Sequence, residues 1–94
     1  MQTIENHKRI LIDAMCTIIG CKEDELMKCR RRPYPFSRGL IFRKLYNYGY
    51  TFAEIASATK VTRTTIAYLV GTTSNTQMDL YKAIEEEFNK VELC

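Results

Sequence analysis

Basic side chains that can engage an anionic partner occupy two separate places in this sequence. Three consecutive arginines, Arg30, Arg31 and Arg32, precede a Pro-Tyr-Pro stretch, and Arg63 stands within a run of threonines. Guanidinium groups form paired hydrogen bonds with phosphate oxygens and with guanine edges, and threonine hydroxyls bond to both kinds of acceptor. These residue types indicate recognition of a polyanion.

The positive charge is concentrated in the middle of the chain. Residues 26–78 carry nine Lys or Arg and one acidic residue, a net of +8, whereas residues 1–25 sum to −2 and residues 79–94 to −3. A cationic segment between mildly acidic ends suits a polyanionic partner better than a uniformly basic surface does. An ordinary solvated charged surface is the alternative interpretation.

Other kinds of chemistry find little support in the residue types. The chain has one histidine, no G-x-S-x-G motif and no GxxxxGK[ST] phosphate loop, so we expect neither an enzyme nor a bound cofactor. The four cysteines lie five, eight and sixty-five positions apart, which is not the paired spacing of a zinc site. We therefore expect no metal and interpret the cysteines as free thiols.

The size of the chain limits its organisation. A length of 94 residues with 46% hydrophobic content predicts a single compact domain over residues 1–94. The first residues lack the basic-then-apolar order of a secretory signal, and the longest apolar stretches are too short to span a bilayer. We expect a cytoplasmic protein without a membrane partner.

Helical periodicity predicts an all-α fold, a bundle of five or six helices that positions the basic residues. Thr3 is placed to cap a first helix that runs to Ile19 and stops at Gly20. Apolar residues cover so much of this helix that it is either deeply buried or shared with a partner chain, as in a homodimer through the first helix. A short second helix is expected at residues 22–29.

A basic loop is expected at about residues 28–35, because Pro33 and Pro35 each remove a backbone donor and disfavour helix at the preceding residue. A third helix is predicted at residues 36–48, ending at Gly49. Its outward-facing cations are Arg38, Arg43 and Lys44. Three tyrosines are expected to lie in or at the boundary of the core rather than to stack on bases: Tyr46, Tyr48 and Tyr50.

Residues 51–70 have the pattern of a helix-turn-helix. Thr51 and Glu54 form a T-x-x-E capping box for a helix that reaches Ala58, and Thr62 is placed to cap a second helix that stops at Gly71. The apolar residues that would hold the two helices at a steep angle are Ile55, Val61, Ile66 and Leu69. Lys60 occupies the turn where glycine is usual, because the backbone there often takes a positive φ.

The second helix of this pair is the candidate for reading nucleic acid. With Ile66 and Leu69 inward, the helical period turns five residues wholly or partly outward: Thr62, Arg63, Thr64, Ala67 and Tyr68. Arg63 suits a guanine or a phosphate, and the threonine hydroxyls and the methyl groups suit phosphates, base edges and thymine methyls. Thr65 either joins this surface or is a buried threonine that bonds an upstream carbonyl.

A final helix is expected at about residues 76–90. Its buried side would consist of Met78 or Leu80, Tyr81, Ile84 and Phe88, and its solvent side is acidic.

The chain also resembles a known family, the C-terminal DNA-binding domain of the bacterial replication initiator DnaA, which belongs to the Trp-repressor-like helical group. The resemblance covers roughly residues 3–70, through the segments TIEN, IGCKEDELMKCRRR, FAEIA and TRTTIAYL in that order. In that family the basic loop enters the minor groove of DNA, and the helix that begins near a D-H-T-T-V motif reads the major groove.

The resemblance implies roles for individual residues. Thr64, Thr65 and Ile66 match T-T-V, whereas Thr62 and Arg63 stand in place of the Asp-His pair, so we expect a different target sequence. By the resemblance, Arg30, Arg31 and Arg32 would supply the minor-groove arm. Apart from the resemblance, further basic residues are expected to contact the DNA backbone or minor groove: Lys28, Arg38 and Lys60.

The sequence therefore predicts a sequence-specific module that binds double-stranded DNA in replication or transcription control. The alternative is a helical protein-interaction or oligomerisation module without direct DNA readout, which the apolar first helix and the acidic last helix would suit.

Overall fold

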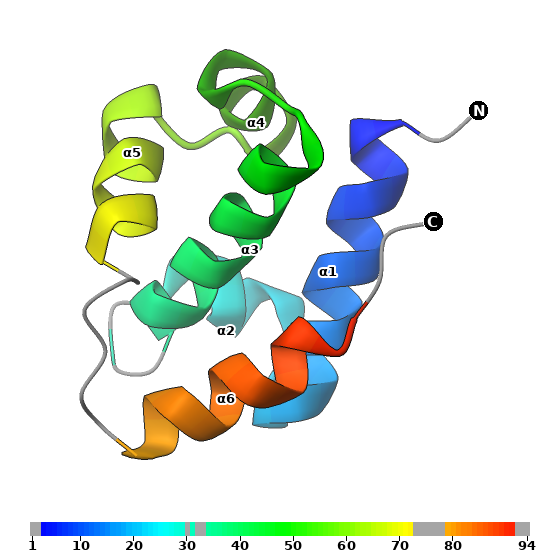
Figure 1. Cartoon of the computed structure of the whole chain (residues 1–94), viewed down its shortest axis with the longest axis vertical. Helices are drawn as coiled ribbons and strands as arrows, with labels where there is room; N and C mark the ends of the chain where they lie inside the picture. The colour runs from blue at the N-terminus through cyan, green and yellow to red at the C-terminus, as the bar shows by residue number, and fades with distance from the viewer. Residues whose placement is uncertain (1–2, 30, 32–33, 73–78, 92–94) are drawn as a thin grey trace.

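Six α-helices make up the part of the chain that the computed structural model describes, which is residues 3–29, 31, 34–72 and 79–91. The helices are α1 (Ile4–Ile19), α2 (Glu23–Lys28), α3 (Tyr34–Tyr48), α4 (Phe52–Thr59), α5 (Arg63–Thr72) and α6 (Asp79–Asn89). These residues contain no strand, so the predicted all-α bundle is confirmed (Figure 1). Residues 76–78, where the final helix was expected to begin, lie outside the described residues.

Helix α1 begins and ends at the predicted residues. The Thr3 hydroxyl accepts a hydrogen bond from the Asn6 N–H at 3.3 Å, which satisfies one of the amides that lack a partner in the first turn. At the other end Gly20 takes the left-handed conformation, with φ 79° and ψ 42°, and its N–H donates to the carbonyl of Cys16. A glycine adopts this conformation without the steric cost that a side chain would add.

Helix α3 begins two residues earlier than predicted. We expected residues up to Pro35 to be non-helical, but α3 starts at Tyr34, whose N–H donates to the Arg31 carbonyl at 2.9 Å. Pro35 lies in the first turn, where a backbone N–H has no acceptor within the helix and where the fixed φ of proline is already helical. The proline therefore helps to start this helix, and the basic loop is shorter than expected.

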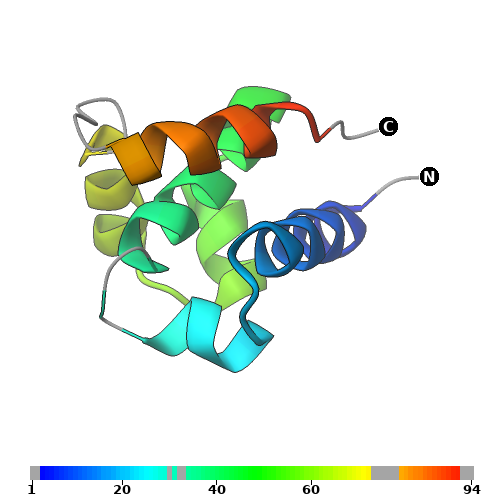
Figure 2. The ribbon, with the colours of Figure 1, turned by 90° about the horizontal axis from the view of Figure 1, so that it is seen from below.

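Helix α3 is the central element of the bundle. It packs against α1, α2, α4, α5 and α6, and seven of its fifteen residues are buried. In Figure 2, α2 and α6 lie on opposite sides of α3, with α5 and α1 on the remaining two. The centre of the core is formed by Leu40, Ile41, Phe42 and Leu45 of this helix.

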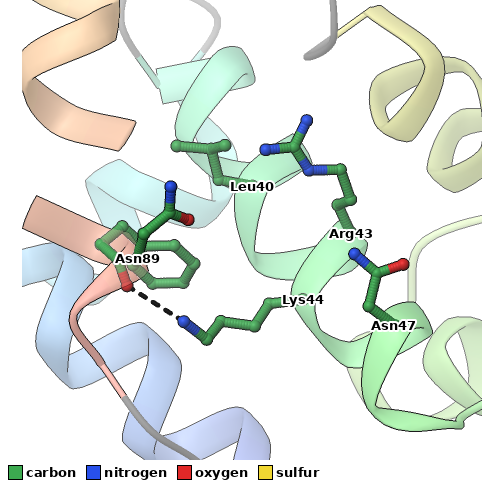
Figure 3. A pocket seen from close by; sticks show the side chains of 6 residues that line it. Leu40, Arg43, Lys44, Asn47 and Asn89 are labelled. Atoms are coloured by element: carbon green, nitrogen blue, oxygen red, sulfur yellow. Dashed lines mark hydrogen bonds between the residues drawn. The ribbon is translucent and has the colours of Figure 1, made fainter. Parts of the chain in front are cut away.

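Two cations of α3 that we predicted to face outward instead hold α6. The Arg43 guanidinium lies 3.4 Å from the Glu85 carboxylate, and the Lys44 ammonium donates to the Phe88 carbonyl at 3.1 Å (Figure 3). The Lys44 nitrogen also lies 5.1 Å from the centre of the Phe88 ring. The prediction is wrong because a helix with neighbours on every side leaves little free surface, and the carbonyls at the end of α6 need donors.

The apolar surface of α1 is largely buried within the single chain. Leu11, Ile12 and Met15 are almost completely buried, and α1 packs against α2, α3, α4 and α6. The partly buried apolar residues that pack against the same core are Ile4, Cys16, Ile18 and Ile19. The broad apolar stripe that pointed to a homodimer is thus largely explained by the fold of one chain.

Two isoleucines of α1 test this arrangement. Ile12 is 3% exposed and Ile10 is 37% exposed, so Ile12→Ala should lower the free energy of unfolding by about 2–4 kcal/mol through lost burial and a cavity. Ile10→Ala should cost less than about 1 kcal/mol. Urea denaturation of both variants measures the difference, and equal costs would contradict the burial described here.

Candidate nucleic-acid interface

Helices α4 and α5 form a packed pair joined by residues 60–62. Ile55 and Ile66 are completely buried, Leu69 is nearly so, and Val61 packs against them from the connecting segment. These are the four apolar residues predicted to hold the pair together. The Thr51–Glu54 capping box is also present, with both hydrogen bonds formed at 3.0 and 3.1 Å, and α4 ends at Thr59 rather than at Ala58.

The connecting segment begins with a strained residue. Lys60 has φ 59° and ψ 31°, which is the left-handed conformation, and its N–H donates to the Ala56 carbonyl at 2.8 Å. The positive φ predicted for this turn is therefore confirmed. The Lys60 side chain is exposed and forms no ion pair with any described residue.

Two threonines form the start of α5. The Thr62 hydroxyl accepts from the Thr65 N–H at 3.3 Å and donates to the Thr65 hydroxyl at 2.8 Å, so Thr62 caps the helix as predicted. Thr65 is exposed, which rules out the buried alternative for this residue. Gly71 lies within α5, which continues to Thr72, so the predicted stop at this glycine is wrong.

The outer surface of α5 is continuous and open. The exposed residues are Thr62, Arg63, Thr64, Thr65, Ala67 and Tyr68, and the Tyr68 side chain is 69% exposed. Arg63 forms no ion pair with any described residue. A cation, hydroxyls, methyl groups and one aromatic ring are thus available to a partner on one helix.

The basic loop joins α2 to α3, and α3 packs against α5. Lys28 and Arg31 are exposed and, within the described ranges, neither takes part in an ion pair, whereas Arg30 and Arg32 lie outside the described residues. Figures 1 and 2 both place the start of α3 beside α5, and these two helices pack against each other. Arg31 is tied to the start of α3 through its carbonyl, which accepts from Tyr34.

Arg38 does not face outward as predicted. Its Nη1 donates to the carbonyls of Leu26 and Cys29, at 2.8 and 2.7 Å, and burial lowers the pKa of this guanidinium from its ordinary value. The carbonyls in the last turn of a helix accept no hydrogen bond from within that helix. The end of α2 therefore needs a donor from another element. Arg38 therefore joins the end of α2 to α3 rather than offering its charge to a partner.

Two consecutive residues of α1 hold α4 at its two ends. His7, which is completely buried, shares a 2.6 Å hydrogen bond between its Nδ1 and the hydroxyl of Tyr50, just before the α4 cap. Lys8 donates to the Ala58 carbonyl at 2.9 Å, in the last turn of α4. We did not predict the role of His7, although its four-residue spacing to Leu11 and Met15 places it on the buried side of α1.

The three tyrosines at the end of α3 lie at the boundary of the core. Tyr50 is partly buried, whereas Tyr46 and Tyr48 are 47% and 49% exposed. Tyr48 packs edge-on against His7 with ring centres 4.4 Å apart, and Tyr46 stacks on Phe52 with ring centres 4.5 Å apart. One ring thus supports α1 and the other supports the start of α4.

The Cys16 thiol of α1 is free and partly buried. Burial raises the pKa of the Cys16 thiol to about 11, so little reactive thiolate forms at neutral pH.

Among the described residues no three His, Cys, Asp or Glu side chains are placed to hold a metal ion. A cleft of about 250 Å³ between α3 and the end of α6 is lined by Arg43 and Lys44 and contains the hydrogen bond from Lys44 to the Phe88 carbonyl (Figure 3). No helix in the described ranges has the length and apolar character needed to cross a membrane.

Comparisons with models of known protein families, with curated proteins and with solved structures give no match for this chain.

The strained turn gives a prediction about Lys60. Lys60→Gly should raise the free energy of unfolding by about 1 kcal/mol, because glycine adopts a positive φ without the clash that a Cβ causes. Lys60→Ala is the control, since it removes the charge but keeps the Cβ. Thermal unfolding at equal pH compares the three proteins, and a glycine variant no more stable than the alanine variant would show that the turn is unstrained.

The contact between α1 and the start of α4 gives a second prediction. Tyr50→Phe should cost about 1–3 kcal/mol of stability, because it leaves His7 Nδ1 buried without its hydrogen-bond partner. Tyr48→Phe removes a hydroxyl from a neighbouring ring whose contact with His7 is through its edge, and should change stability by less than about 0.5 kcal/mol. Chemical denaturation measures both, and equal effects would be evidence against the buried hydrogen bond.

Proposed function

We propose that this protein is a sequence-specific module for double-stranded DNA, in which α4 and α5 act as a helix-turn-helix. Helix α5 enters the major groove, and the basic loop between α2 and α3 contacts the backbone or the minor groove. The observation that carries the proposal is the open outer surface of α5, where Arg63 and three threonines are exposed together.

Dimensions and charge support this proposal. Ten residues of α-helix are about 15 Å long and about 10–12 Å across, which fits the major groove, about 12 Å wide. Within the described residues, Lys28, Arg31, Lys60 and Arg63 are exposed and form no ion pair. Their charges are therefore available to neutralise phosphates, whereas Arg38, Arg43 and Lys44 hold neighbouring helices.

The role in the cell rests on the resemblance to the DNA-binding domain of the replication initiator. By that resemblance the module acts in replication or transcription control, and residues 30–32 supply a minor-groove arm. The proposed location, the cytoplasm, rests on the sequence of the first residues, which lack the order of a secretory signal. The rival function, a protein-interaction or oligomerisation module, has lost its main support, because the apolar stripe of α1 is mostly buried in one chain. Its remaining support is the acidic exposed side of α6.

Binding-site selection from random duplexes, followed by affinity measurements over a range of salt concentrations, tests the proposal. Wild-type affinity should fall by about 0.9 log units per contacted phosphate for each tenfold rise in salt. Replacing Arg30, Arg31 and Arg32 together with alanine should weaken binding to all duplexes and reduce this slope. Arg63→Ala should instead change preference at one base pair by about 1–3 kcal/mol.

A matched control removes two exposed lysines elsewhere, Lys22 at the start of α2 and Lys82 on α6. This variant should keep the wild-type sequence profile and nearly the wild-type salt slope. Identical profiles for wild type and Arg63→Ala would remove Arg63 from base reading. Absence of any selected duplex, together with salt-insensitive binding to a protein, would favour the rival function.

A further inference from the structure

A shallow groove of about 640 Å³ lies where the end of α3, the turn that follows it and the start of α4 meet the start of α5. Its lining residues are Tyr46, Asn47, Gly49, Tyr50, Thr51, Phe52, Ala53 and Arg63. We propose that this groove holds one sugar-phosphate strand of the bound duplex, which makes Tyr46 and Asn47 DNA-contacting residues on a third element. The inference rests on the function proposed above.

The lining of the groove matches the chemistry of a sugar-phosphate strand. The Asn47 amide and the Thr51 hydroxyl are side-chain types that bind phosphate oxygens, and Tyr46 combines a hydroxyl with a ring face. The Tyr46 ring stacks on Phe52 at 4.5 Å with an angle of 20° between the planes, so it is supported from behind while remaining 47% exposed. A supported ring face suits the apolar side of a deoxyribose.

The charges around the groove favour an anion. No lining residue carries a carboxylate, and Arg63 supplies a cation at the edge. The nearest carboxylate along the chain is Glu54, which accepts a hydrogen bond from the Thr51 N–H at 3.0 Å in the capping box and keeps its negative charge near Tyr50. Asn47 is an exposed neutral donor and acceptor that also lines the cleft with Arg43 and Lys44 (Figure 3), so the thermal unfolding of each Asn47 variant is compared with that of wild type.

Continuity with α5 decides which partner is proposed. Arg63 both lines the groove and begins the exposed surface of α5, so a strand that follows the groove passes directly onto that surface. The opposite end of α5 lies beside the start of α3, where the basic loop arrives (Figure 1). The groove, α5 and the basic loop would then contact successive parts of one duplex. A peptide bound in the groove would make no contact with the exposed surface of α5 or with the loop.

Charge changes at Asn47 test the proposal without removing any ring. On the selected duplex, Asn47→Lys should tighten binding. It should also steepen the slope of log affinity against log salt concentration by about 0.9, the value for one added phosphate contact. Asn47→Asp should raise the dissociation constant about tenfold, which corresponds to a loss of about 1.4 kcal/mol of binding free energy. The matched controls are Asn6→Lys and Asn6→Asp on the exposed side of α1, which lies across the molecule from α5 (Figure 2). These should leave affinity and slope almost unchanged.

A pair of tyrosine variants supplies the second arm. Tyr46→Ala should weaken duplex binding about tenfold, whereas Tyr48→Ala, which removes an equally exposed ring outside the groove, should bind within about twofold of wild type. Far-ultraviolet circular dichroism confirms that each variant is folded at the assay temperature.

The outcomes separate this inference from the proposed function. If the Asn47 variants behave like the Asn6 variants, or Tyr46→Ala like Tyr48→Ala, while the Arg63 and triple-arginine variants still weaken binding, the groove proposal is overturned and the function stands. If wild type binds no duplex at all, both fail. A groove that binds a peptide instead would leave DNA affinity unchanged in all groove variants, which also overturns the inference.

Discussion

The packing of α3 against every other helix is the constraint on which the structure depends. Because its sides are covered, the long cations of this helix cannot all extend into solvent, and three of them bond to groups on neighbouring helices. Arg38 binds carbonyls at the end of α2, and Arg43 and Lys44 bind groups on α6. A cation near the carbonyl end of a helix also interacts favourably with the helix dipole. The central helix thus fixes where its neighbours end as well as where they pack.

This arrangement divides the basic residues of the middle segment that the structure describes into two groups. Those on α3 are used to assemble the bundle, whereas those on α5, in the turn before it and at the end of α2 are left exposed. The charge excess visible in the sequence therefore overstates what a partner can meet. The exposed cations nevertheless belong to elements that pack against the same central helix, because α3 packs against both α2 and α5.

Local sequence features predicted the fold well, and long-range contacts account for most of the errors. Thr3, Gly20, the Thr51–Glu54 box, Lys60 and Thr62 were all assigned from neighbouring residues, and each acts within one or two helical turns. The outward orientation of Arg38, Arg43 and Lys44 was wrong, since it depends on helices far along the chain. His7 had no assigned role for the same reason, because its partner Tyr50 is 43 residues away. Pro35 is a different case, in which a helix-breaking residue was not considered as a helix-starting one.

His7 and Lys8 contact the chain at the two ends of α4. These contacts have a consequence for any partner that binds the exposed surface of α4 and α5. A rotation of α4 away from α1 would break the Lys8 contact in its last turn and disturb the part-buried His7–Tyr50 hydrogen bond just before its first turn. Its orientation is consequently set during folding, before a partner arrives. A preorganised helix loses less conformational entropy on association than one that must be ordered by its ligand. The stability of α1 and the orientation of α4 are thereby linked.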